Sequence, residues 1–201
     1  TWQWKNILYD PLSVWNGNAF YPFLESVTGS DHLFSQVVTG LPVYLLTKNP
    51  FISYHFVLYF GFAMGAWGMY RLGLLLFDHS GAALASAVFY TVALPRTIHA
   101  VAHIHLSFMA WLPWSVYFLN QLFKRKRPVY AVGVIATTVL QALGGWYIAV
   151  YHAIILGTVF LWLSIRQGKR ETILAGTISG LVSMGLILPF AIPYIGRPDV
   201  Q

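Results

Sequence analysis

Residues 128–165, PVYAVGVIATTVLQALGGWYIAVYHAIILGTVFLWLSI, indicate the fold class most clearly, because they run for 38 residues without one Asp, Glu, Lys or Arg. A membrane-spanning helix needs about 20 apolar residues, so this stretch has room for two spans of about 18 residues joined by a tight turn. Gly144 and Gly145 lie near its middle, where a hairpin can reverse. The stretch therefore predicts two antiparallel spans.

The rest of the chain repeats this pattern. Further charge-free stretches are 49–70, 79–95, 97–123 and 172–196. Only 9% of the 201 residues are charged and 57% are hydrophobic, whereas soluble domains are about 25% charged. This composition excludes an ordinary soluble domain, a disordered chain and a protein that binds nucleic acid through a solvated basic face. It predicts an all-α, polytopic transmembrane helix bundle.

Basic residues indicate the orientation, because Lys and Arg gather in cytoplasmic loops. The runs 124–127 and 166–170 flank residues 128–165, so both ends of that hairpin are predicted to be cytoplasmic. Alternation then gives about six spans: 51–72, 80–95, 107–123, two within 128–165, and 172–195. Eight basic residues fall inside and four outside. We expect a multi-pass protein of the bacterial cytoplasmic (inner) membrane.

The predicted domains are residues 1–50 on the exoplasmic side, a six-span bundle over 51–196, and a tail over 197–201. Residues 1–50 alternate aromatic residues with turn formers, so we expect an ordered loop. Residues 33–46 form an apolar stretch too short to span, which is typical of a short re-entrant or interfacial helix.

Polar residues on the predicted exoplasmic side are the candidates for chemistry. On a continuous helix over 96–106, Arg96, His99 and His103 fall at positions i, i+3 and i+7 and share a face. His105 is rotated away from that face. Together with carboxylates from residues 1–50, these side chains could bind an anionic group, a metal ion or a sugar.

Each candidate also has a structural interpretation. Asp31 follows Thr28 by three residues, so it could complete a capping box. Asp10 precedes a proline and could be a turn residue, and Arg96 could extend to lipid phosphates. The histidine pair at i, i+4 could ligate a metal or only form hydrogen bonds.

Five segments together resemble the GT-C-type bacterial integral-membrane glycosyltransferases. The segments are WNGNAFYPF (15–23), SDHLFSQVVTGLPVYLLTKNP (30–50), GMYRL (68–72), ALPRTIHAVAHIHLSFMAWLPWSVYFL (93–119) and LQALGGWYIAVY (140–151). The resemblance implies an exoplasmic active site, a polyprenyl-phosphate-linked sugar as donor, and a carboxylate that acts as base or metal ligand. Asp31 matches that carboxylate and is the candidate catalytic residue. The candidate substrate-binding residues are Asp10, His32, Arg96, His99 and His103.

The resemblance also implies an additional first helix with an acidic outer end, and more than six spans. We therefore expect the chain to be a piece of a longer protein, which leaves its catalytic competence open. A divalent metal ion is a candidate cofactor, although no metal ligand set is predicted.

A second hypothesis is a non-catalytic accessory subunit of an energy-transducing or photosynthetic membrane complex, packed against lipids, pigments or other subunits. His55 and His152 lie within predicted spans, but bonding to a neighbouring helix is favoured over pigment ligation. A solute transporter is less favoured, because the sequence has neither an inverted repeat nor an intramembrane carboxylate pair.

Overall fold

The computed structural model describes residues 2–17, 25–100 and 102–195, and these ranges hold helices and no β-strand. The α-helices are α1 (Trp2–Tyr9), α2 (Phe34–Thr47), α3 (Pro50–Phe77), α4 (Ser80–Val92), α5 (Leu94–His99), α6 (Ile104–Ser107), α7 (Leu112–Arg125), α8 (Pro128–Ala142), α9 (Trp146–Gln167) and α10 (Arg170–Ala191). Short 3-10 helices are η1 (Pro11–Ser13), η2 (Ser26–Gly29) and η3 (Ile192–Tyr194). The predicted tail, 197–201, and part of the segment 15–23 lie outside the described residues.

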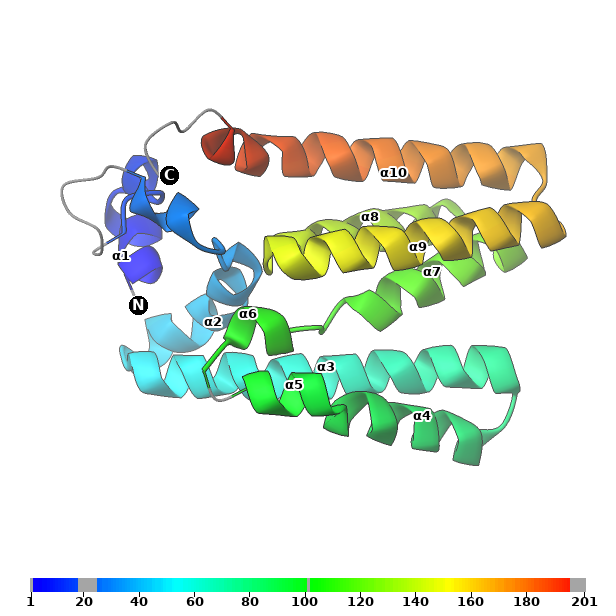
Figure 1. Cartoon of the computed structure of the whole chain (residues 1–201), viewed down its shortest axis with the longest axis horizontal. Helices are drawn as coiled ribbons and strands as arrows, with labels where there is room; N and C mark the ends of the chain where they lie inside the picture. The colour runs from blue at the N-terminus through cyan, green and yellow to red at the C-terminus, as the bar shows by residue number, and fades with distance from the viewer. Residues whose placement is uncertain (1, 18–24, 101, 196–201) are drawn as a thin grey trace.

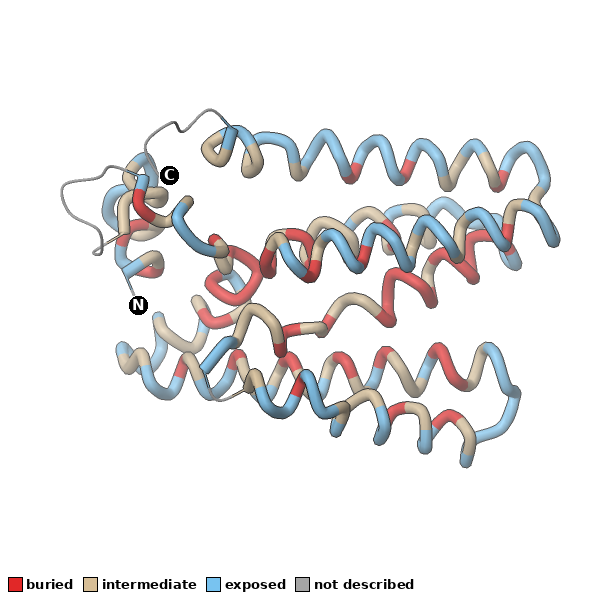
Figure 2. Tube along the Cα trace, in the orientation of Figure 1, coloured by how far each residue is buried: buried red, intermediate tan, exposed pale blue. Residues whose placement is uncertain are grey.

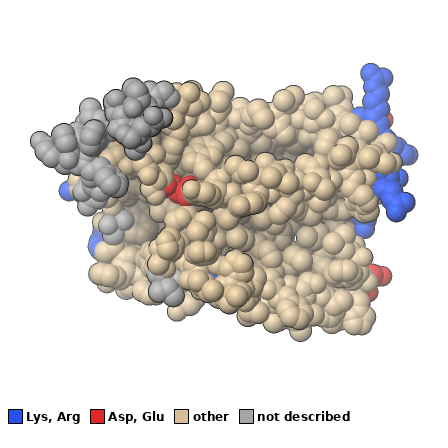
Figure 3. Space-filling view, in the orientation of Figure 1, with Lys and Arg blue, Asp and Glu red and all other residues tan. Residues whose placement is uncertain are grey.

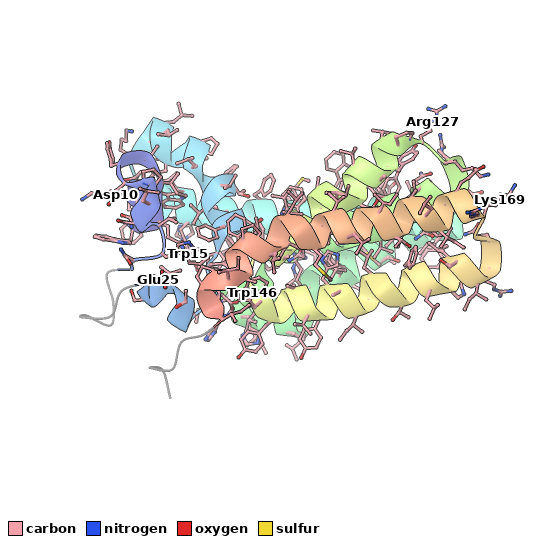
Figure 4. The ribbon with its side chains drawn as sticks, turned by 90° about the horizontal axis from the view of Figure 1, so that it is seen from above. Asp10, Trp15, Glu25, Arg127, Trp146 and Lys169 are labelled. Carbon is pink, nitrogen blue, oxygen red and sulfur yellow. The ribbon has the colours of Figure 1, made fainter. Side chains whose placement is uncertain are left out.

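The helices form a bundle in which α3, α4, α7, α8, α9 and α10 run back and forth along the long axis (Figure 1). One end holds α1, α2 and the turn between α8 and α9, and we call it the α1 end. The other end holds the turns that leave α3, α7 and α9. Lys and Arg gather there, so we call it the basic end (Figure 3). Arg127 and Lys169 mark it in Figure 4.

Helix α7 is the core of the bundle. Figure 2 shows buried residues following it, whereas α9 and α10 expose most of their length. Its buried residues are Pro113, Trp114, Ser115, Val116, Tyr117, Leu119, Asn120, Gln121, Leu122 and Phe123. Two apolar clusters join α7 to its neighbours, one through Leu72 of α3 and one through Val134 of α8 and Leu163 of α9.

Helix length supports part of the predicted topology. The helices long and apolar enough to cross a membrane, by length and composition, are Pro50–Phe77, Trp146–Gln167 and Arg170–Tyr194 in the described chain. Helices α2, α4 and α8 are apolar but shorter. At 1.5 Å per residue, the 13 residues of α4 extend only about 20 Å, less than the hydrocarbon core of about 30 Å. The chain has the helical bundle of a membrane protein, with three helices of spanning length rather than the six predicted spans.

Local predictions had mixed outcomes. The hairpin at Gly144–Gly145 is confirmed, since α8 ends at Ala142 and α9 begins at Trp146. The short apolar helix is confirmed as α2. The predicted span at 107–123 is wrong at its start, because α7 begins only at Leu112. The continuous helix over 96–106 is also wrong: α5 ends at His99 and α6 begins at Ile104.

Candidate functional site

The turn between α8 and α9 is the point at which distant segments meet. The backbone N–H of Ser35, in the first turn of α2, donates to the carbonyl of Leu143 at 2.8 Å. The side-chain amide of Gln36 donates to the carbonyl of Gly144 at 2.7 Å. Three of the segments that carry the resemblance, 30–50, 93–119 and 140–151, therefore come together at the α1 end.

Gln141 joins this turn to α7. Its Oε1 accepts the backbone N–H groups of Trp111 and Leu112 at 3.0 and 3.1 Å, and its Nε2 donates to the carbonyl of Phe108 at 3.0 Å. The N–H groups at a helix start have no partner within the helix, so this fully buried amide acts as a cap supplied by another helix. Sequence reasoning missed Gln141. The available signal was an amide in an uncharged apolar stretch, where an unpaired polar group is costly.

Asp31 caps the start of α9. Its Oδ1 accepts the backbone N–H of Trp146, the first residue of that helix, at 2.6 Å. A carboxylate is favoured there, because a helix N-terminus carries partial positive charge. Gly145 permits this approach: it has φ +155, and a Cβ on it would lie 3.3 Å from Cγ of Asp31.

The predicted capping box at Thr28 is therefore wrong. The Thr28 hydroxyl donates to the carbonyl of Glu25, and α2 begins after Leu33 without a side-chain cap. Asp31 is a capping residue as predicted, but for α9, a helix that starts 115 residues further along the chain. Local spacing could not indicate such a distant partner.

Asp31 also faces a row of histidines. Oδ2 of Asp31 lies 3.6 Å from Nε2 of His105, which is an ion-pair distance if His105 is protonated. The His105 ring lies 5.7 Å from that of His103, which lies 5.4 Å from that of His99. The break between α5 and α6 turns His105 toward Asp31. His105, which the helical projection placed away from the site, thus joins the predicted residues.

Asp31, His105 and His103 differ in how far their side chains are exposed to solvent. The Asp31 side chain is 6% exposed and that of His105 is 22% exposed, and His103 is exposed. Burial lowers the pKa of His105, Asp31 opposes this by favouring the imidazolium, and His103 and His99 lower the pKa further. A lowered pKa keeps His105 neutral near pH 7, so one ring nitrogen can accept a proton.

His32 lies behind Asp31 in an aromatic enclosure. Its ring stacks on Phe34 at 5.1 Å and meets Trp146 and Tyr194 edge-on at 5.1 and 6.1 Å. Neither ring nitrogen has a hydrogen-bond partner among the described residues. Burial lowers the pKa of His32 to about 4, against opposing effects of Asp31 and the carbonyl of Leu143. His32 is therefore neutral and shielded from solvent, and it lies next to Asp31 without being exposed at the site.

Arg96 points away from the histidines. Its guanidinium lies between the rings of Phe62 and Tyr90, at 4.4 and 4.8 Å. It donates to the carbonyl of Gly61 at 2.7 Å and to that of Ser107 at 3.0 Å. Arginine remains cationic near neutral pH. Arg96 is 1% exposed and ties α6 to α3, so the shared face predicted for Arg96, His99 and His103 does not form.

Asp10 lies apart from this group. It is exposed at the end of α1 and precedes η1 without a side-chain cap. Figure 4 shows it well separated from Trp146. Among the described residues no group of three His, Cys, Asp or Glu is placed to hold a metal ion. The structure thus brings together Asp31, His105, His103 and His99, with His32 behind them.

No protein-family profile matches the chain, and searches of characterised proteins and of solved structures find no significant match.

Proposed function

We propose that this chain is a multi-pass protein of the bacterial cytoplasmic membrane with a glycosyltransferase-like site at its α1 end, on the exoplasmic side. The donor would be a sugar linked to polyprenyl phosphate. The observation that carries the proposal is a buried carboxylate, Asp31, facing partly exposed His105 at the end opposite the basic cluster. Histidine is the side chain that most often acts as a general base, and a neighbouring carboxylate can orient it.

The sidedness of the charges supports the orientation. Lys124, Arg125, Lys126, Arg127, Arg166, Lys169 and Arg170 all lie in or beside the turns of the basic end. Such clusters are retained in the cytoplasm during insertion. The passes of α3, α4 with α5, α7, α8, α9 and α10 between the two ends would allow six crossings, of which α3, α9 and α10 are long and apolar enough to span by themselves (Figure 1).

The geometry supports a different proposed role for each of the polar groups. Asp31 is a positioning residue, because one oxygen binds Trp146 N–H and the other faces His105. His105 would take the proton from the acceptor hydroxyl as that oxygen attacks the anomeric carbon and the polyprenyl phosphate leaves. His103, which is exposed, and His99 beside it would contact the departing phosphate. Arg96 would hold α6, and with it His105, against α3.

Transfer of a radiolabelled sugar tests the proposal. Membranes containing the protein are supplied with a panel of polyprenyl-phosphate-linked hexoses and pentoses, and labelled product is counted. His105→Gln should reduce the rate at least about 100-fold, the usual contribution of a general base, without changing thermal stability. His55→Gln, a substitution on α3 outside the histidine row, should leave the rate unchanged.

Two outcomes would oppose the proposal. Full transfer by His105→Gln would remove the base from the mechanism. Absence of transfer with every donor, together with isolation of the chain as a fixed component of a larger particle, would favour the accessory-subunit hypothesis.

A further inference from the structure

A second site lies inside the bundle, away from the histidine row. A cavity of about 450 Å³ opens between α7, α8, α9 and α10, a volume in the range of small-molecule sites. Leu119, Val134, Phe160 and Ile187 contribute apolar wall from the four helices, and no residue lining it carries a formal charge. An ionic ligand would thus have no counter-charge there, so the cavity favours a neutral one.

The cavity is open on the side where α9 and α10 face outward. Gly157 of α9 and Gly180 of α10 line it and are exposed. A Cβ on either glycine would meet nothing within 4 Å. In a membrane this opening faces hydrocarbon, so a ligand would enter sideways from the bilayer.

One polar group in this wall has a defined hydrogen-bonding role. Nε2 of His152 lies 2.7 Å from Oγ of Ser115, and that Oγ lies 2.8 Å from the carbonyl of Leu112. A serine hydroxyl has one hydrogen, and we assign it to the carbonyl of Leu112, so that the hydroxyl accepts from His152. The hydrogen of the neutral imidazole is therefore on Nε2.

Nδ1 of His152 then carries a lone pair and can only accept a hydrogen bond. It has no hydrogen-bond partner among the described residues, while the histidine itself lines the cavity. Thr138 lines the same cavity, and its hydroxyl also lacks a partner in the described chain. The cavity thus combines an apolar wall with an acceptor that requires a donor.

We propose that this cavity binds a neutral lipid alcohol, with its hydrocarbon chain against the apolar wall and its hydroxyl donating to Nδ1 of His152. This inference does not depend on the proposed glycosyltransferase-like function, since it uses none of the residues of the histidine row.

Competition among three ligands of equal chain length tests the hydrogen bond. Binding of tritiated 1-dodecanol to the detergent-solubilised chain is measured above that of protein-free micelles. Unlabelled 1-dodecanol should compete about tenfold better than dodecane, which lacks the hydroxyl. Methyl dodecyl ether should compete less well than 1-dodecanol, because it cannot donate a hydrogen bond to Nδ1 of His152. An ether that competes as well as the alcohol would overturn the assignment.

Two substitutions on one helix test the location. Gly180→Leu places a side chain in the cavity and should reduce specific 1-dodecanol binding at least tenfold. Gly185→Leu is the matched control, because Gly185 also has open space around it but does not line the cavity. Gly157→Leu should repeat the loss from the facing helix. Binding unchanged in both cavity variants, with unchanged thermal stability, would show that the alcohol does not bind here.

Discussion

Replacing Asp31 with alanine should destabilise the α1 end, because it removes the oxygen that accepts the N–H of Trp146 at 2.6 Å. Loss of a helix cap costs about 0.5–2 kcal/mol. Loss of a negative charge at a helix N-terminus costs about 0.3–1 kcal/mol. Since the Asp31 side chain is only 6% exposed, water cannot readily replace it. We expect Asp31→Ala to lower the free energy of unfolding by about 2 kcal/mol.

Asp31→Asn separates the hydrogen bond from the charge. The amide oxygen can still accept from Trp146, so the cost should be about 0.3–1 kcal/mol, the charge contribution alone. Thermal unfolding in detergent, followed by circular dichroism, measures both variants. For a chain of this size, 2 kcal/mol corresponds to a decrease in melting temperature of roughly 4–8 °C.

The control is Asp10→Ala, which removes an exposed carboxylate with no capping role and should change stability by less than about 0.5 kcal/mol. If Asp31→Ala has the same melting temperature as Asp10→Ala, Asp31 does not cap α9. If Asp31→Asn has the same melting temperature as Asp31→Ala, the stabilisation comes from the charge and not from the hydrogen bond, and the capping geometry is refuted.

Three further predictions concern other parts of the chain. The pKa of His32 is about 4 in the folded chain and 6.5 in the unfolded chain, so between these pH values only the unfolded chain takes up the proton. Acidification from pH 6.5 to 4 should therefore lower the free energy of unfolding by on the order of 3 kcal/mol. In thermal melts, His32→Phe should lose this dependence of stability on pH. Gln141→Leu leaves three buried or part-buried backbone groups unpaired and should cost about 2–4 kcal/mol. Gln121→Leu, which removes one hydrogen bond, should cost less than half as much in the same melts. The sequence contains no cysteine, so single cysteines can report sidedness. In intact cells an impermeant maleimide should label Lys48→Cys and should not label Lys169→Cys. Equal labelling of the two variants would contradict the proposed topology.

Charge-free length and basic clusters predicted much of the architecture. The hairpin between α8 and α9, the helix within 33–46 and the basic turns all follow from local composition. The break between α5 and α6 could not be predicted that way, because Arg96 and Ser107 are held by contacts with each other and with Gly61 of α3. Those contacts decide where the helix ends, and no local signal reports them.

The same limit applies to the site. Residue type identified Asp31 and the histidines, since charged and titratable groups are rare in this chain. The pairing of Asp31 with His105 depends on the break between α5 and α6, which contacts between distant segments determine, so the projection onto one continuous helix selected Arg96 and omitted His105. The capping role of Gln141 could not be predicted from local sequence either, because its three partners belong to the segment before α7 and to the start of that helix.

Asp31 both caps α9 and faces His105. This double role determines how catalysis should be tested. Removing its carboxylate weakens the start of α9, so lost sugar transfer in Asp31→Ala could follow from disrupted structure alone. His105 makes no side-chain hydrogen bond in the described chain, and its one polar partner is Asp31 at 3.6 Å. Changing His105 therefore perturbs chemistry with little structural cost. Activity that falls in His105→Gln while the melting temperature holds would separate the two roles, which no substitution of Asp31 can do.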